Sequence, residues 1–246
     1  MIKENKVVKY LLYAIGEIVL VILGILIALQ INSANEVKKD RLLEQQYYCR
    51  LLEDVEQDKE QIVSLISDAQ ERLENSNKMA RILQLPNPDL TEVNVQLAKI
   101  QRGVGKNFRA NNTAYEDLKS GANLNLITDI PLKGLLNNYF KNVSTYAATV
   151  KINYENDGRI AQKVMDNVIE FGLVYGYKHA VKNTFDKDVL DKIMKEKPER
   201  LTKTVIDYYY NLSIMRILNN ARRVQLYQFI EKEIDTLTSA LKKKCN

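Results

Sequence analysis

Glu17 is the residue whose surroundings most restrict its chemistry, because it is the single charged residue between Tyr10 and Ile31. A carboxyl group inside a membrane-spanning helix costs about 2.5–3.5 kcal/mol on insertion scales and is usually paired or functional. Helical spacing places it on one face with small residues, which permit a second helix to approach closely. This face comprises Ala14, Glu17, Val21, Gly24 and Ala28. We predict a helix–helix contact here, within an oligomer or with a partner.

Two other interpretations of Glu17 stay open. The residue lies about 10 Å from Tyr10 along a helix axis, so its carboxylate can reach the cytoplasmic headgroups without a partner. A ring of Glu17 side chains in an oligomer can instead line a path for protons or ions. The small residues beside Glu17 favour the helix contact over both alternatives.

Cys49 and Cys245 are the two cysteines, the minimum for one disulfide bridge in an oxidising compartment. If the first and last long helices run antiparallel with Leu85 opposite Arg200, the two cysteines are displaced by about 13 Å along the axis. A disulfide needs Cα atoms within about 7 Å, so this alignment argues against a bridge unless the C-terminus frays. An intramolecular bridge, an intermolecular bridge and a buried free thiol at Cys49 all remain open.

Patterns for enzyme catalysis are missing from the sequence. His179 is the single histidine, which excludes metal sites built from several imidazoles, and we expect it to be solvated. The run GVGKN at 103–107 lacks the GxxxxGK[ST] spacing of a phosphate-binding loop and follows a predicted helix rather than a strand. We therefore expect no enzyme, no metal and no cofactor, and we identify no small-molecule substrate.

Aromatic and basic clusters indicate surfaces rather than active sites. Tyr208, Tyr209 and Tyr210 point in three directions on a helix, so we expect at least one to be exposed. Core packing explains one or two of them, and an interface, where tyrosine is enriched, can explain the rest. Basic clusters lie at 38–39, 222–223 and 242–244. We interpret these cations as solvated helix surface or as contacts to anionic lipid headgroups, and we expect no nucleic-acid partner.

A membrane anchor is the first element that must position these residues. The 246 residues are 46% hydrophobic and 27% charged, with a net charge of +5, which is typical of a folded chain. Residues 10–31 form an apolar run, and a spanning helix needs about 20 residues. The following segment offers a poor cleavage site, so we expect an uncleaved signal anchor. The predicted domains are a cytoplasmic N-terminus at 1–9, a transmembrane helix at 10–32 and a helical extracytoplasmic domain at 33–246.

The orientation of the anchor is only weakly encoded. Lys9 directly precedes the span, whereas the first cation beyond it is Lys38. Cations near the ends of a span tend to stay in the cytoplasm, so this difference favours a cytoplasmic N-terminus.

Helical periodicity dominates the rest of the chain and predicts an all-α fold. Beyond the span a seven-residue apolar series is accompanied by a second one, offset by four residues. The first series is Tyr48, Val55, Ile62, Ala69, Ser76 and Leu83, and the second is Leu52, Lys59, Ile66, Leu73 and Ala80. Residues 36–85 contain no glycine or proline, so one helix of about 75 Å can continue from the span. We predict an elongated helical bundle with coiled-coil-like long helices.

Capping and helix-breaking residues predict the remaining boundaries. Thr91 is expected to cap a short helix, while Asp129 and Pro131 begin a second long one. Pro198 suits the start of a third long helix, and Gly158 is a candidate break in the second. Short helices are predicted at 91–102, 113–119 and 186–195, and long helices at 131–171 and 198–244.

Two sequence blocks resemble a known family. Lys9–Asn32, KYLLYAIGEIVLVILGILIALQIN, and Thr113–Ile127, TAYEDLKSGANLNLI, look like those of uncharacterised single-pass membrane proteins common in Bacteroidota. The family usually continues Asn-x-Trp-Asn-Glu after the span, where this chain has Ala34 in place of the tryptophan, an interfacial anchor. The resemblance implies an inner-membrane protein with a helical periplasmic domain, and it implies no activity.

Three functions are compatible with these features. The first is a membrane-anchored helical scaffold or accessory subunit of an envelope complex, in contact with membrane lipid and assembled as a homo-oligomer or within a larger membrane protein complex. The second is an extracytoplasmic ligand-sensing domain that signals through a separate membrane partner. The third is the ion or proton pathway built on a ring of Glu17 side chains.

Overall fold

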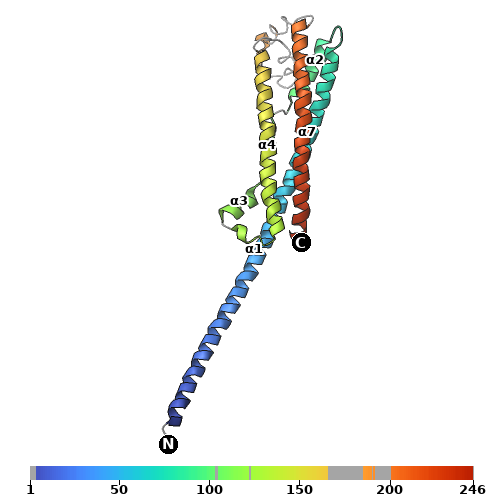
Figure 1. The fold of residues 1–246 in the computed structure, drawn as a ribbon. Helices are drawn as coiled ribbons and strands as arrows, with labels where there is room; N and C mark the ends of the chain where they lie inside the picture. Colours follow the sequence, from blue (N-terminus) through green and yellow to red (C-terminus); the bar gives the residue numbers. More distant parts are fainter. Residues whose placement is uncertain are drawn as a thin grey trace.

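The computed structural model describes residues 4–102, 105–121, 123–165, 185–189, 191 and 201–245. Its elements are α1 (Glu4–Leu83), α2 (Leu90–Gln101), α3 (Thr113–Ser120), the 3₁₀ helix η1 (Asn123–Asn125), α4 (Ile130–Met165) and α7 (Lys203–Cys245). The described ranges contain helices and no strand, which confirms the predicted all-α fold. The upper half of α1 forms an elongated bundle with α2, α4 and α7, and its lower half leaves the bundle alone (Figure 1).

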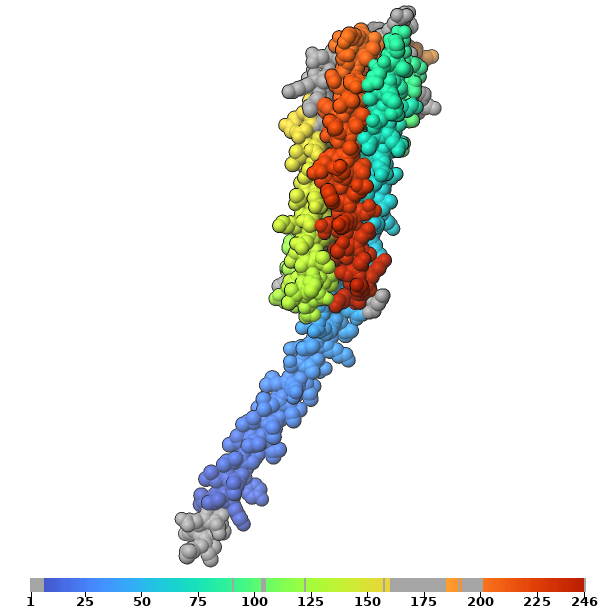
Figure 2. All heavy atoms as spheres, turned by 45° about the vertical axis from the view of Figure 1, so that its right-hand side comes forward, coloured from blue at the N-terminus to red at the C-terminus, as the bar shows by residue number. Residues whose placement is uncertain are grey.

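The first helix is continuous from the apolar segment into the bundle, as predicted. α1 has 80 residues and is therefore about 120 Å long. Gly16 and Gly24 lie within it without interrupting it. Every side chain from Val7 to Leu43 is exposed, and Figure 2 shows this part of α1 standing free below the bundle. The first buried side chain along α1 is that of Glu44.

α7 runs antiparallel to the upper half of α1 in a constant register. Lys59 donates a hydrogen bond to Asp235 at 2.7 Å, and Gln84 donates one to Tyr210 at 3.1 Å. Lys59 and Gln84 are 25 positions apart, and so are Tyr210 and Asp235. The two helices therefore stay side by side along their shared length.

This register corrects the predicted alignment of Leu85 with Arg200. The level of Gln84 and Leu85 is occupied by Tyr210, about ten residues further along α7. The reason is that α7 extends beyond the end of α1, where its first turns pack on α2. Val205 and Tyr209 belong to a core cluster with residues of α2. Arg200 itself lies outside the described residues.

Two apolar clusters form the core. The larger one joins α1, α4 and α7 with the segment around α3, and the smaller one closes the distal end between α1, α2 and α7. The larger cluster includes Leu51, Val55, Ile62, Leu118, Leu136, Tyr139, Tyr227, Ile230 and Ile234. The smaller cluster includes Met79, Leu83, Val93, Leu97, Ile100, Val205, Tyr209 and Leu212.

The buried face of α1 differs in part from the predicted one. All six members of the first apolar series are buried, as expected. The second buried series is shifted by one residue from the predicted series and consists of Leu51, Asp58, Leu65, Arg72 and Met79. Of the predicted series Leu52, Lys59, Ile66, Leu73 and Ala80, only Ala80 is buried. Two members of the true series are charged, so an apolar pattern could not reveal it.

Local hydrogen bonds define the helix starts. Asp89, not Thr91, caps α2, because its carboxylate accepts a hydrogen bond from the Thr91 backbone N–H at 2.8 Å. Asp129 begins α4 as predicted, accepting from the Leu132 N–H at 3.0 Å. α4 passes through Gly158 without a break. The predicted helix 186–195 lies partly outside the described residues. Three further residues named in the sequence analysis lie wholly outside them, namely Phe171, His179 and Pro198.

Candidate functional site

The predicted helix-contact face lies on the free lower half of α1. Its five members, Ala14, Glu17, Val21, Gly24 and Ala28, are all exposed. α1 is long and apolar enough to cross a membrane, and within the described chain its apolar part is uncovered. Apart from the adjoining helix backbone and chain neighbours, a Cβ atom added at Gly24 would meet no atom within 4 Å. The face is therefore open to a second helix.

A buried glutamate closes the base of the bundle, where α1 leaves it. Glu44 Oε1 accepts hydrogen bonds from the Tyr48 hydroxyl at 2.6 Å and from the Thr128 backbone N–H at 2.7 Å. Glu44 Oε2 pairs with Arg41 at 2.8 Å. Burial alone would raise the pKa of Glu44, but these donors lower it to about 2. Glu44 is therefore ionised and ties the segment before α4 to α1.

Two further side chains of α1 hold the extended segment that leads into α3. Asp58 Oδ1 accepts hydrogen bonds from the backbone and side-chain N–H groups of Asn111 at 2.8 and 2.9 Å. Gln61 bonds the backbone of Arg109 twice, as donor and as acceptor. Because these residues are one turn apart, α1 supplies a ladder of polar partners to a segment without regular structure.

Asp58 is the charged residue of this pair, and it also contacts α4. Its side chain is fully buried, and Oδ2 accepts a hydrogen bond from the Tyr139 hydroxyl of α4 at 2.6 Å. Burial raises the pKa of Asp58 to about 6, although the Tyr139 and Asn111 donors oppose this shift. The same burial raises the pKa of Tyr139. Asp58 therefore joins α1, α4 and the extended segment at one buried point.

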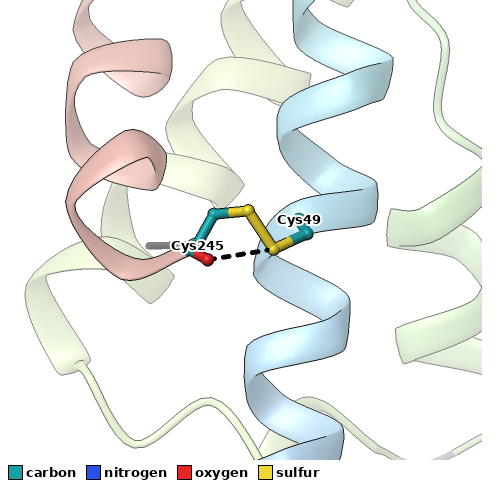
Figure 3. Close-up of a disulfide and its surroundings, with 2 residues drawn as sticks. All are labelled: Cys49 and Cys245. Atoms are coloured by element: carbon teal, nitrogen blue, oxygen red, sulfur yellow. Dashed lines mark hydrogen bonds between the residues drawn. A yellow bond between two sulfur atoms is a disulfide. The ribbon is translucent and has the colours of Figure 1, made fainter.

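The two cysteines form an intramolecular disulfide (Figure 3). The Cα atoms of Cys49 and Cys245 are 4.9 Å apart, within the range that a bridge requires. The expected displacement of about 13 Å is wrong, because it rested on the alignment that the helix register corrects. Cys49 Sγ also lies 3.4 Å from the Cys245 carbonyl oxygen, a close contact since a disulfide sulfur carries no proton. The bridge fixes the end of α7 to α1 about one turn above Glu44.

The tyrosine run packs within the chain more than expected. Tyr209 is 6% exposed, and Tyr208 and Tyr210 are half-buried against the distal core cluster, so none of the three is classed as exposed. Their position on α7 beside α2 explains this burial. The partly exposed edges of Tyr208 and Tyr210 leave the interface a prediction.

The basic clusters have three different settings. Lys38 and Lys39 are exposed on the free part of α1. In the C-terminal triplet, Lys242 pairs with Glu56 at 3.0 Å and Lys244 with Asp129 at 2.8 Å. Arg223, expected at the surface, is instead only 7% exposed because it lies beside α4, while Arg222 next to it in sequence is exposed.

Glu44, Asp58 and Arg72 are the important residues that sequence analysis missed. All three lie at seven-residue intervals in one buried series of α1, together with apolar residues. This spacing was the only feature of the sequence that could have indicated their burial. Among the described residues, no group of three or more His, Cys, Asp and Glu side chains is arranged to hold a metal ion. The GVGKN run lies partly outside the description, at 103 and 104.

Together these features define a helical bundle built on the continuation of one N-terminal helix that is long and apolar enough to cross a membrane. The chain belongs to a family of unknown function (DUF6090), whose model matches residues 17–155. The matched range begins at Glu17, includes α2 and α3, and ends within α4. No curated protein and no solved structure matches the chain.

Proposed function

We propose that this protein is a membrane-anchored helical scaffold or accessory subunit of an envelope complex, and that it associates through the apolar part of α1. The observation that carries the proposal is the open face around Glu17 and Gly24 on a helix that continues directly into the bundle. A scaffold needs one element that assembles in the membrane and a second that projects from it, and α1 supplies both.

The charge of Glu17 supports association. No described residue forms a hydrogen bond or ion pair with this carboxyl group, and the insertion cost of an ionisable side chain is about 2.5–3.5 kcal/mol. A neighbouring helix that offers a hydrogen-bond partner would offset part of this cost. Gly24 and Ala28 allow the backbones to come close enough for such a bond.

The proposed location is the inner membrane, with the N-terminus in the cytoplasm and the bundle in the periplasm. The Cys49–Cys245 bridge supports this orientation, because disulfides persist in oxidising compartments and are rare in the cytosol. Lys9 at the start of the span supports it as well. Alkylation of protein taken directly from cells tests the assignment, since two modified thiols would contradict it.

Paired substitutions test association through this face. Gly24→Ile should reduce the yield of crosslinked oligomer or complex in native membranes more than Ile25→Ala does. The added side chain has open space within the chain, so misfolding would not explain the loss. Ile25 is rotated by about 100° from Gly24 on the helix and serves as the control. Equal yields from both variants, or a strictly monomeric native protein, would remove the proposed interface.

A second candidate function is ligand sensing by the bundle, with a separate membrane partner that carries the signal. The unbroken path of α1 favours it, because a change in the bundle can reach the span without crossing a flexible joint. A thermal-shift screen with small metabolites discriminates between the two functions. The Glu17 pathway is tested separately by proton flux in liposomes, where equal flux in Glu17→Gln would exclude it.

A further inference from the structure

The middle of α7 directs polar side chains into the bundle. Between Leu212 and Leu226, every buried side chain of this helix is polar, namely Ser213, Arg216, Asn220 and Arg223. Arg72 Nε of α1 donates to the side-chain oxygen of Asn220 at 3.2 Å. Arg216 and Arg223 are engaged in further interactions. This part of α7 therefore adds no apolar side chain to the core, and it lies between the two apolar clusters.

The apolar side chains of the same stretch point outward. Leu218 is 65% exposed and Ile214 is 36% exposed, although an amphipathic helix normally buries its apolar side. We call this surface the outward face of α7. Its members follow one another at spacings of three or four residues and are Tyr210, Ile214, Ile217, Leu218 and Ala221. Figure 2 shows α7 at the front of the bundle, between α4 and the upper part of α1, so this face is open within the described chain.

The outward face is also uncharged, unlike the lower part of α7. From Tyr208 to Ala221, a fully described stretch, the one charged residue is Arg216, which is buried. Lys232 and Lys243 follow Ile214 by about five and eight whole turns, so they lie on the same side of the helix, and both are exposed. A helix side that meets only water carries such charges. The outward face therefore differs from an ordinary solvated surface.

The height of the outward face excludes lipid of the anchoring membrane as its partner. Gln84 of α1 donates a hydrogen bond to Tyr210 of α7. Eight positions closer to the base, the same antiparallel register places Leu218 level with Ser76. Ser76 follows Ile31 by 45 positions, which is about 68 Å along α1. The headgroup region of a bilayer is only about 5–8 Å deep on each side, so a protein surface must cover this face.

We propose that the outward face of α7 is a contact between two parallel copies of this chain, related by a twofold axis along the bundle. The inference rests on the membrane anchoring in the proposed function, but not on the face around Gly24. Copies anchored in one membrane stand parallel, and the uninterrupted α1 holds their outward faces at the same height. In a twofold contact, each side chain near the axis meets its own counterpart. The uncharged stretch permits this pairing, whereas Lys232 and Lys243 would repel their counterparts.

The size of the outward face fits a contact that depends on the anchor. The stretch from Tyr208 to Ala221 is about 20 Å long and a helix is about 10 Å wide, so the face covers about 200 Å². A stable interface buries about 800 Å² on each partner. The contact is therefore too small to hold two free bundles together. Anchoring in one membrane raises the local concentration of the copies and allows the contact to form.

Photo-crosslinking of the full chain in native membranes tests this contact. The crosslinking residue benzoylphenylalanine takes the place of Leu218, and two differently tagged copies of the chain are expressed together. We expect a product of twice the mass of the chain that carries both tags. The matched control carries the same crosslinker in place of Glu74, which is exposed on α1 within one turn of the height of Leu218, and it should not give this product.

A charge substitution provides the second test. Leu218→Glu places two carboxylates opposite each other across the axis, and it should reduce the doubly tagged product captured by a crosslinker at Ile214 by at least about tenfold. Gln70→Glu adds the same charge at an exposed position of α1 and should leave the yield unchanged. Because Leu218 is exposed, the variant should fold, and formation of the Cys49–Cys245 bridge verifies this.

The outcomes separate this contact from association through the span. Equal yields from Leu218 and Glu74, a Leu218 product that contains a different protein, or an undiminished yield in Leu218→Glu would overturn the proposal. Absence of a doubly tagged product from Leu218, with the effect of Gly24→Ile retained, would overturn the α7 contact and leave the proposed function intact. Recovery of the chain in the soluble fraction would overturn both.

Discussion

Breaking the Cys49–Cys245 bridge should destabilise the bundle mainly through the unfolded chain. The bridge joins residues separated by 196 positions, so it restricts nearly the whole chain beyond the apolar part of α1 when that chain unfolds. In the folded protein, the end of α7 is also held by the buried side chains of Leu237 and Leu241 and by the Lys242–Glu56 ion pair. The native contacts should therefore survive reduction, while the unfolded state gains conformational freedom.

The magnitude follows from the loop length. The chain-entropy model gives about 5 kcal/mol for a closed loop of this size, and native disulfides typically contribute about 2–4 kcal/mol. We expect Cys245→Ser to lower the free energy of unfolding by an amount in this range. The measurement is denaturant unfolding of the full chain in detergent, followed by circular dichroism at the helical minimum, with and without a thiol reductant.

A double-mutant cycle separates the bridge from local packing at the half-buried cysteines. Because either single substitution removes the whole bridge, Cys49→Ser, Cys245→Ser and the double variant should lose the same stability, and reductant should affect none of them. Losses that add in the double variant would show that the two side chains act independently. Unchanged stability of the unmodified protein on reduction would refute the argument.

Three further predictions concern Asp58, Glu44 and the apolar segment of α1. The pKa of Asp58 is raised to about 6 from an ordinary 3.8, so its contribution is fully present below pH 4 and lost as the pH rises through 6. The bundle should be more stable at pH 5 than at pH 7 by about 1–2 kcal/mol, and Asp58→Asn should remove that component in thermal scans at the two pH values. The pKa of Glu44 is lowered from 4.5 to about 2, so its contribution to stability is present above pH 4.5 and lost as the pH falls through 2. Glu44→Gln should lower the free energy of unfolding by about 1.5–3 kcal/mol at pH 7, measured by denaturant titration. An unchanged free energy of unfolding would contradict the ionised role of Glu44. Residues 36–246 should stay soluble and helical without the anchor, because core packing begins only at Tyr47, and a strand-dominated dichroism spectrum would contradict this.

Sequence analysis predicted the helices where local signals specify them. Residues 36–85 contain no glycine or proline, and this absence predicted the uninterrupted path of α1. Asp129 and Pro131 marked the start of α4 correctly, because a cap acts within one helical turn. Thr91 was wrong by two residues for the same local reason, since Asp89 offers a carboxylate to the same N–H groups.

The missing information was long-range. The antiparallel register depends on how far α7 extends past the end of α1. The sequence of α7 contains no local pattern that predicts the packing of Val205 and Tyr209 on α2. This extension alone decides whether Cys49 meets Cys245. Asp58 and Arg72 stay hidden for a different reason, since a charged residue signals a buried position only when its partners are known. Those partners, Tyr139 and Asn220, lie more than 80 positions away in the chain.

The free part of α1 has a mechanical consequence. Between Ile31 and Glu44 a lone helix about 20 Å long separates the apolar segment from the bundle, and it contains no glycine or proline at which to pivot. Above it, the Glu44 contacts and the disulfide clamp the same helix on two sides. Rotation of the apolar segment about the axis of α1 would therefore rotate the upper part of the same helix, and the bundle attached to it, as one body. The rotational angle of the apolar segment thus determines which face of the bundle points toward a neighbouring molecule.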